Sequence, residues 1–302
     1  MDLSIREDVL RRCEELDIPL VGFASADSWD APPFEPWVPE EFRPRVIWPE
    51  TRAVVVIGMP VFLPILETTP SIAYHELYKT VNSLLDMNAY RIAFFLNRHG
   101  FPSIPISRDG YGSIAILRKK PIAFFSHRHA AYLAGLGTFG VNNILLTPEF
   151  GPRVRFASVF TSADIPPNRI SEERLCIRCM RCRDICPVDA LRGGDYPEDL
   201  TDKDACSGRS EELNRRHTSP CGLCIRVCPV GKDRELYRRT DMEIYDEGNS
   251  RYDRITKPGT TSGHTGSADK RTDCSVTAFR YPVAARATAT SEDRALPSSK
   301  PW

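Results

Sequence analysis

Cysteine is the residue type whose number and spacing in this chain indicate chemistry. Eight of the ten cysteines lie between positions 176 and 228, which leaves Cys13 and Cys274 outside that segment. The first run, CIRCMRCRDICP, has the spacing C-x2-C-x2-C-x3-C and ends in proline. The second run, CGLCIRVCPVGK, has the spacing C-x2-C-x3-C-P, and one further cysteine precedes it in KDACSGRS. Clustering of this kind indicates metal ligation, because a disulfide framework spreads its cysteines along the chain.

The spacing of the first run is that of a bacterial ferredoxin, in which three thiolates bind one [4Fe–4S] cluster and the fourth binds the other. Two-residue gaps direct successive sulfurs to different corners of one cluster, and the three-residue gap turns the last sulfur away. The same crossover predicts two ligand sets. They are Cys176, Cys179, Cys182 and Cys228 for one cluster, and Cys186, Cys206, Cys221 and Cys224 for the other. Zinc also uses C-x2-C pairs and is the alternative, although it gives the two Cys-Pro endings no purpose.

The length and composition of the sequence limit the classes of protein to which it can belong. The 302 residues suffice for a buried core and one appended module. Lys and Arg number 40 and Asp and Glu number 40, so the formal net charge of zero gives no global basic surface for nucleic acid. The apolar runs have the length of strands, and the first residues, MDLSIREDVLRRCEELDI, are charged and unlike a signal peptide. These features predict a cytoplasmic protein with no membrane partner.

The chain divides into three segments by its patterns. The sequence predicts strands over 18–25, 52–60, 101–107 and 153–161, and helices over 1–17, 70–99 and 126–136. This alternation predicts an α+β or α/β core over 1–168, followed by the cysteine module over 169–240. Beyond about residue 257 the chain is rich in Ser, Thr, Gly and Pro, so 241–302 is expected to be a mostly disordered extension.

The stretch AGLGTFGVNN contains a literal G-x-G-x-x-G at Gly135, Gly137 and Gly140. A dinucleotide-binding loop needs a strand before the first glycine and a helix after the third. The preceding residues, SHRHAAYLA, are helical in character, which favours a helix that ends at glycine and a tight loop that approaches a flat cofactor. Asn142 and Asn143 would line that loop, either bonding a ligand or capping the loop itself.

The glycine stretch, continued as AGLGTFGVNNILLTPEFGPRVRFASVFT and followed by two cysteine runs, resembles the epoxyqueuosine reductases and the catalytic subunits of reductive dehalogenases. The segments AYHELYKTV, with Tyr74 and His75, and WPETRAVVVIGMPVF extend the resemblance to about residues 10–235. It implies a nitroreductase-like α/β domain over 1–168 that binds base-off cobalamin and substrate, while the cysteine module delivers electrons to cobalt. The cofactor-binding residues that follow from it are Gly135, Gly137, Gly140, Asn142 and Asn143.

Three features depart from the family pattern. The epoxyqueuosine reductases carry an acidic residue, in a DSAP motif, at a position that corresponds to about Pro121. The tRNA-modifying members have a C-terminal helical-repeat domain where this chain has the extension expected to be disordered. The dehalogenases carry a twin-arginine signal that this chain lacks. The resemblance therefore predicts a divergent member, and it disfavours a nucleic-acid substrate.

Reductive cleavage needs a proton donor beside the substrate, because it leaves a basic oxygen or carbon. Asp109 and Tyr111, in the turn-rich loop RDGYGS, and His127, at the start of a helix, are the candidate catalytic groups. A polar surface turn and a helix-capping histidine are the structural alternatives. Arg153 and Arg155 alternate along a strand and are expected to share one face, toward corrinoid side chains, a substrate anion or solvent.

Two functions follow from these features. The first is a cobalamin-dependent iron–sulfur oxidoreductase in which a ferredoxin or flavodoxin donates electrons through two [4Fe–4S] clusters to the corrinoid. The corrinoid would then cleave a C–O or C–halogen bond in a small-molecule substrate. The second is a ferredoxin-type electron-transfer protein that docks a partner enzyme and has no corrinoid of its own. An intact, occupied pocket beside the clusters would distinguish the two.

Overall fold

A four-stranded sheet forms the centre of the core. The computed structural model describes residues 3–108, 113–119 and 123–246. The strands are β1 (Leu20–Ser25), β2 (Ala53–Pro60), β3 (Ser103–Ile106) and β6 (Val154–Thr161), in the order β1-β2-β6-β3. All neighbours are antiparallel, and Val55 lies opposite both Phe23 and Val159. The four strands predicted from the sequence are therefore present.

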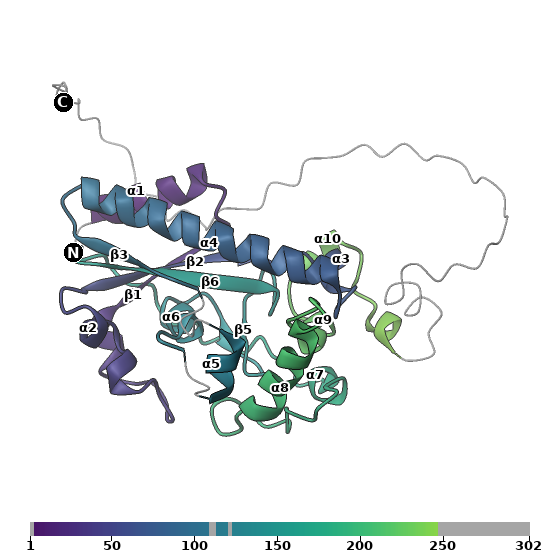
Figure 1. Cartoon of the computed structure of the whole chain (residues 1–302). Helices are drawn as coiled ribbons and strands as arrows, with labels where there is room; N and C mark the ends of the chain where they lie inside the picture. Colours follow the sequence, from purple (N-terminus) through teal and green to yellow (C-terminus); the bar gives the residue numbers. More distant parts are fainter. Residues whose placement is uncertain (1–2, 109–112, 120–122, 247–302) are drawn as a thin grey trace, which may run out of the picture.

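Helices cover both faces of this sheet (Figure 1). One face packs against α1 (Leu3–Glu15) and α4 (Ile72–Arg98), and the other against α6 (His127–Leu133). Along β2, Val55 contributes to the first core and Val54 to the second, because successive side chains of a strand point to opposite faces. The continuous apolar run of β2 thus reflects burial on both sides, as its sequence predicted. Cys13 lies in the first core, where burial raises its pKa to about 12.

The long helix α4 joins the sheet to the cysteine module. It starts after Ser71, whose hydroxyl accepts from the Tyr74 N–H at 3.1 Å, and it ends at His99 before Gly100, which has φ 82°. Tyr74 is buried against the second cysteine run, and the His75 ring hydrogen-bonds to the Ser219 carbonyl at 2.6 Å. Both residues of the segment that carries the family resemblance therefore have packing roles at the junction with the module.

The remaining elements are short. In the core they are α2 (Pro44–Ile47), α3 (Leu63–Leu66), α5 (Ile114–Lys119) and the hairpin of β4 (Thr138–Phe139) with β5 (Leu145–Leu146). The cysteine module contains α7 (Arg181–Asp184), α8 (Lys203–Asn214), α9 (Leu223–Arg226) and α10 (Asp233–Leu236). Of these elements, α2 lies at one end of the sheet, and α3, α9 and α10 lie at the other (Figure 1). Within the described ranges, no helix has the combined length and apolarity that crossing a membrane requires.

A short packed segment follows the cysteine module. A 3-10 turn, Met242–Tyr245, packs onto the cysteine module and buries Ile244 and Tyr245 beside Val227. The first residues of the predicted extension, 241–246, are thus packed, because two apolar side chains there find a buried surface that composition alone does not reveal. Residues 247–302 lie outside the described residues.

Candidate functional site

The two cysteine runs fold alike, as their matching spacing predicts. In the first run, Met180 follows Cys179 with φ 61° and precedes the turn α7. In the second, Gly222 follows Cys221 with φ 70° and precedes α9. A left-handed residue at the same place in each run turns the chain sharply, so that the flanking sulfurs can face a common centre. The module is thus built from two similar cysteine loops.

The eight sulfurs fall into two neighbouring groups. In the first group, burial and the nearby thiols of Cys228, Cys179 and Cys176 raise the pKa of Cys182 to about 12. In the second group, burial raises the pKa of both Cys206 and Cys224, and the thiols of Cys221 and Cys186 act on both in the same direction. The last cysteine of each run therefore joins the group centred on the other run. Cys182 of the first group also acts on Cys224, so the two groups adjoin, and the crossover that the ferredoxin spacing expects stays a prediction.

The first group borders a hollow shared with the core. The space in this hollow that a molecule the size of water can occupy amounts to about 20 Å³. The core contributes Val141, Asn142 and Leu146 to its lining, and the module contributes Cys176, Cys179, Cys182 and Cys228 with their loops. The first cysteine group therefore lies directly against the loop that follows the glycine stretch.

The donor set suits clusters better than single metal ions. Thiolate is the usual ligand of iron–sulfur clusters, and each group offers four cysteines. Ligands of a single zinc ion must converge to about 2.3 Å from it. Among the residues that the structure describes, no three Cys, His, Asp or Glu side chains converge in this way. The corners of a cubane hold its thiolates further apart than the ligands of a single zinc ion, so this spacing is compatible with an iron–sulfur cluster.

Cys206 reaches the second group from the helix α8. Asp202 caps this helix by accepting from the Ala205 N–H at 2.9 Å, which sets its start one turn before Cys206. The opposite side of α8 packs against α5, where Arg118 pairs with Asp204 at 3.4 Å and Glu211 at 3.5 Å. The isolated cysteine in KDACSGRS thus reaches the second run through a helix position that its spacing alone does not specify.

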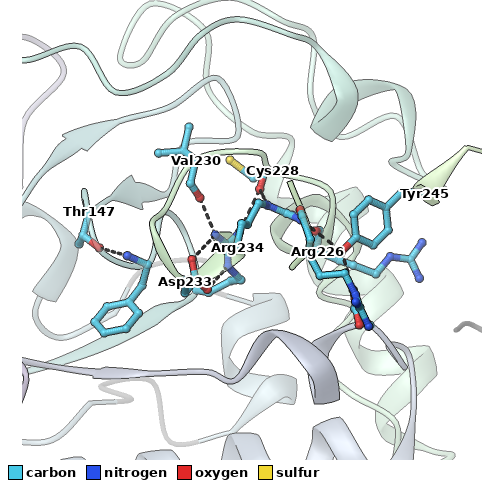
Figure 2. Close-up of polar contacts among 11 residues, drawn as sticks. Thr147, Arg226, Cys228, Val230, Asp233, Arg234 and Tyr245 are labelled. Atoms are coloured by element: carbon cyan, nitrogen blue, oxygen red, sulfur yellow. Dashed lines mark hydrogen bonds and ion pairs between the residues drawn. The ribbon is translucent and has the colours of Figure 1, made fainter. Parts of the chain in front are cut away.

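Buried arginines surround the loop that carries Cys228 (Figure 2). Arg153 donates to both carboxylate oxygens of Asp233 at 2.6 Å and to the Cys228 carbonyl at 3.0 Å. Arg234 donates to the same carbonyl at 2.7 Å and also to the carbonyl of Arg226. Arg153, Arg226 and Arg234 are each at most 2% exposed. These contacts fix the Cys-Pro loop of the second run against the core.

The expectation that Arg153 and Arg155 share one face is wrong. Arg153 precedes β6 and turns toward the cysteine module. Arg155 lies within β6, donates to the Asn82 side chain at 2.6 Å and places its guanidinium 4.1 Å from the ring centre of Tyr78, both on α4. Period-two alternation applies only inside a strand, and Arg153 lies just outside it. Both cations are engaged by other parts of the chain.

The glycine stretch forms a helix end followed by a hairpin. Gly135 has φ 70°, its N–H donates to the Tyr132 carbonyl, and the Leu136 N–H donates to the Ala131 carbonyl. This pair of bonds is the Schellman ending of α6. A helix therefore precedes the first glycine and a strand, β4, follows it. This order excludes the dinucleotide-loop alternative, which needs the reverse.

The chain itself occupies the space beside two of the glycines. A Cβ placed on Gly135 would lie 2.2 Å from the Arg169 carbonyl oxygen, and one on Gly137 would lie 1.8 Å from the Leu146 carbonyl oxygen. At Gly140 the closest atoms are side-chain ends at 3.0 Å. Close approach of backbone to backbone therefore explains Gly135 and Gly137 without a cofactor.

The two asparagines are likewise engaged within the chain. Asn142 accepts from the Ile144 N–H at 3.2 Å. Asn143 donates to the Asp199 carbonyl at 3.0 Å and accepts from the Thr201 N–H at 2.7 Å, which ties the core loop to the cysteine module. The five residues that the resemblance assigns to a corrinoid do not form an open cradle for it. Their role in cofactor binding stays a prediction.

Of the three catalytic candidates, His127 belongs to the part of the chain that the structure describes. Asp109 and Tyr111 are outside the described residues. His127 is buried, with Nδ1 2.9 Å from the Ser158 hydroxyl and Nε2 2.9 Å from the Ser107 carbonyl. Since a carbonyl can only accept, Nε2 donates its proton to the Ser107 carbonyl. The ring thereby joins α6 to β6 and to the end of β3. This geometry favours a structural role, and catalysis by His127 stays a prediction.

An aromatic cluster at the junction of core and module is absent from the sequence predictions. Its rings come from the N-terminal loops, α6, β4 and the module: Phe34, Trp37, His129, Tyr132, Phe139 and Tyr196. His129 Nε2 lies 2.7 Å from the Tyr196 hydroxyl. Burial first, and then the charges of Arg128 and Lys203, lower its pKa to about 3, so the ring is neutral. No local signal pairs His129 with Tyr196, because they lie in different segments of the chain.

Comparisons with known proteins agree with this architecture. The 4Fe-4S binding domain family matches residues 172–192. A tetrachloroethene reductive dehalogenase of Desulfitobacterium hafniense is 27% identical over 198 residues, which are 60% of this chain and 33% of that protein. An epoxyqueuosine reductase of Bacillus cereus is 24% identical over 284 residues, 80% of this chain and 68% of that protein. A solved reductive dehalogenase, studied for B12-dependent dehalogenation, has a TM-score of 0.54 at 19% identity and covers 84% of this chain and 36% of its own.

The cysteine module on a mixed α/β core defines the class as an iron–sulfur protein with the fold of these reductases. The chain is related to the reductive dehalogenases and the epoxyqueuosine reductases, which confirms the resemblance seen in the sequence. The named relatives are reductases, and this supports an oxidoreductase. The chain spans about a third of the length of the dehalogenases that it matches.

Proposed function

We propose that this chain is an iron–sulfur reductase that carries two [4Fe–4S] clusters on its eight grouped cysteines. The crossover grouping of the sulfurs carries the proposal, because each group draws ligands from both runs. Such a set matches two linked cubanes, which transfer one electron at a time. We assign the chain to the cytoplasm, where the reducing environment keeps these thiols free of disulfides.

The two cysteine groups occupy different positions relative to the core. The second group adjoins the start of α4, where Thr69 donates to the Cys221 carbonyl and Tyr74 packs on Gly222. The first group adjoins the core hollow beside Asn142. An external one-electron donor, a ferredoxin or flavodoxin, would supply the electrons, and the core side of the first group is where they would be used.

For the acceptor we propose a corrinoid that supports reductive cleavage of a C–O or C–halogen bond in a small molecule. The support is the shared fold and the similarity to a dehalogenase studied for B12-dependent dehalogenation. The glycine and asparagine contacts described above offer it no open cradle, so other residues of the core would have to contact it. The alternative is an electron-transfer protein that docks a partner enzyme and has no corrinoid of its own.

An anaerobic reconstitution of the full chain tests these proposals. Iron and sulfide should each reach about eight per chain, with a reduced-cluster EPR signal. Tight binding of about two zinc ions with no such signal would overturn the cluster proposal. Cob(II)alamin is then added. A base-off cobalt signal that depends on the protein would support the corrinoid, whereas cluster signals with base-on cobalamin would leave the electron-transfer alternative.

A further inference from the structure

The buried arginines beside Cys228 have a consequence for electron flow. Arg153 and Arg234 both donate to the Cys228 carbonyl, at 3.0 Å and 2.7 Å. Both side chains are withdrawn from water, with exposures of 0% and 2%. In such an environment, a charge interacts with its neighbours more strongly than it would at the surface, because little water screens it. Cys228 therefore lies in a field set by these two cations.

The charges of the two arginines differ in how they are balanced. Arg153 forms a two-pronged ion pair with Asp233, itself 4% exposed, so that the pair as a whole is neutral. The other N–H groups of Arg234 donate to the backbone carbonyls of Arg226 and Arg239 and to the Tyr245 hydroxyl, the last at 3.2 Å. Within the described part of the chain, no carboxylate forms an ion pair with Arg234. One positive charge thus remains unbalanced beside Cys228.

The next carboxylate in the network is already matched. Glu67 accepts from the Tyr245 hydroxyl at 2.6 Å and from Arg239 at 2.8 Å. Glu67 is 3% exposed, and the Arg239 guanidinium provides the charge that its burial requires. The Glu67–Arg239 pair therefore leaves the charge of Arg234 uncompensated.

The second cysteine group has a different electrostatic surrounding. Cys206 lies on α8, whose start carries two carboxylates, the capping Asp202 and Asp204 in the first turn. Arg118, which packs along α8, is paired with Asp204 and Glu211. The buried cation on the side of the second group is Arg226, 1% exposed, whose Nη1 donates to the Thr69 carbonyl at 3.3 Å, whereas Arg153 and Arg234 donate to the carbonyl of Cys228 itself.

We propose that Arg234, supported by Arg153, raises the reduction potential of the cluster on the first group above that of the cluster on the second. This inference rests on the proposed function. One-electron reduction adds a negative charge to a cluster with four thiolates, and a buried cation stabilises the reduced form. The second cluster loses one electron and the first gains it, with no bond or proton transferred. An external low-potential one-electron donor then reduces the second cluster again, so electrons collect on the first cluster, beside the core hollow.

An EPR-monitored redox titration of the reconstituted full chain, with dithionite as reductant, tests the proposal. We expect two one-electron steps, and Cys206→Ser, which removes a ligand of the second cluster, should keep the step of higher potential. In Arg234→Met this step should fall by about 59 mV, a tenfold change in the ratio of reduced to oxidised cluster. Arg234→Lys keeps the charge and should stay near the wild type. The exposed Arg216→Gln is the matched control and should move neither step.

Asp233→Asn provides a test of opposite sign. It keeps the side-chain shape and leaves the charge of Arg153 unbalanced beside Cys228, so the higher potential should rise. If Arg234→Met fails to fold, the Asp233→Asn variant alone tests whether the charge beside Cys228 sets the higher potential. A higher step that is unmoved in both variants, or two steps that shift equally, would overturn the inference while leaving the clusters intact. A chain without two clusters by iron content and EPR would instead overturn the proposed function.

Discussion

Gly137→Ala tests whether the chain's own packing shapes the glycine stretch. The added Cβ would lie 1.8 Å from the Leu146 carbonyl oxygen and 2.8 Å from its carbonyl carbon. Both atoms belong to β5, which pairs with β4 through Thr138 and Leu146. Because the obstacle is backbone and not the end of a flexible side chain, the hairpin has to separate by more than 1 Å.

The expected loss of stability depends on whether the added Cβ clashes with backbone or with a side chain that can move. Overpacking a dense interior costs about 1–3 kcal/mol, and a clash with paired backbone should reach the upper end, about 3 kcal/mol. Gly140→Ala is the matched control in the same motif. Its Cβ would meet only the Asn142 Oδ1 and Leu146 Cδ1 atoms at 3.0 Å, and these side chains can shift. We expect a cost below about 1 kcal/mol for that variant.

Urea denaturation of the cluster-loaded chain, followed by far-UV circular dichroism without oxygen, measures the difference. At an unchanged slope, the midpoint of Gly137→Ala should fall by about 1 M, and that of Gly140→Ala should stay close to the wild type. Equal midpoints for the two variants would refute the reasoning. If Gly137→Ala kept its midpoint and lost only cob(II)alamin binding, the glycine would serve the cofactor and not the hairpin.

Three further results are expected. Cys206→Ser should lower bound iron by about half in an iron assay, because it removes a ligand of one cluster, whereas Cys13→Ala in the core should not; full iron content in the first variant would contradict the assignment. Arg153→Leu leaves Asp233 buried and unpaired and should lower the free energy of unfolding by about 3–5 kcal/mol, and replacing both by leucine should restore most of it. Burial lowers the pKa of His129 to about 3 in the folded chain, whereas in the unfolded chain this histidine binds a proton below about pH 6.5. The free energy of unfolding should therefore fall from pH 7 to pH 4. An equally steep fall in the His129→Gln variant would count against this explanation.

The sequence predicts those elements of the fold that local pattern controls. The continuous apolar run 52–60 predicts a strand that is covered on both faces, because a strand buried on both sides needs apolar residues at successive positions. The strand β2 is buried in this way. The helix of 70–99 ends where Gly100 permits a left-handed turn. The short helix α5 and the packed turn Met242–Tyr245 were not predicted. Both are too short for periodicity to reveal them.

The candidate site divides in the same way between local spacing and distant contacts. By itself the sequence determined the two similar cysteine loops, and its spacing predicts the exchange of Cys186 and Cys228 between two clusters, because a gap of two or three residues limits which way a sulfur can point. Only the tertiary structure decided that Arg153 turns to Cys228, that Gly137 faces Leu146 and that His129 meets Tyr196. Each of these contacts depends on which distant segments the fold brings together, and neither residue type nor local period carries that information.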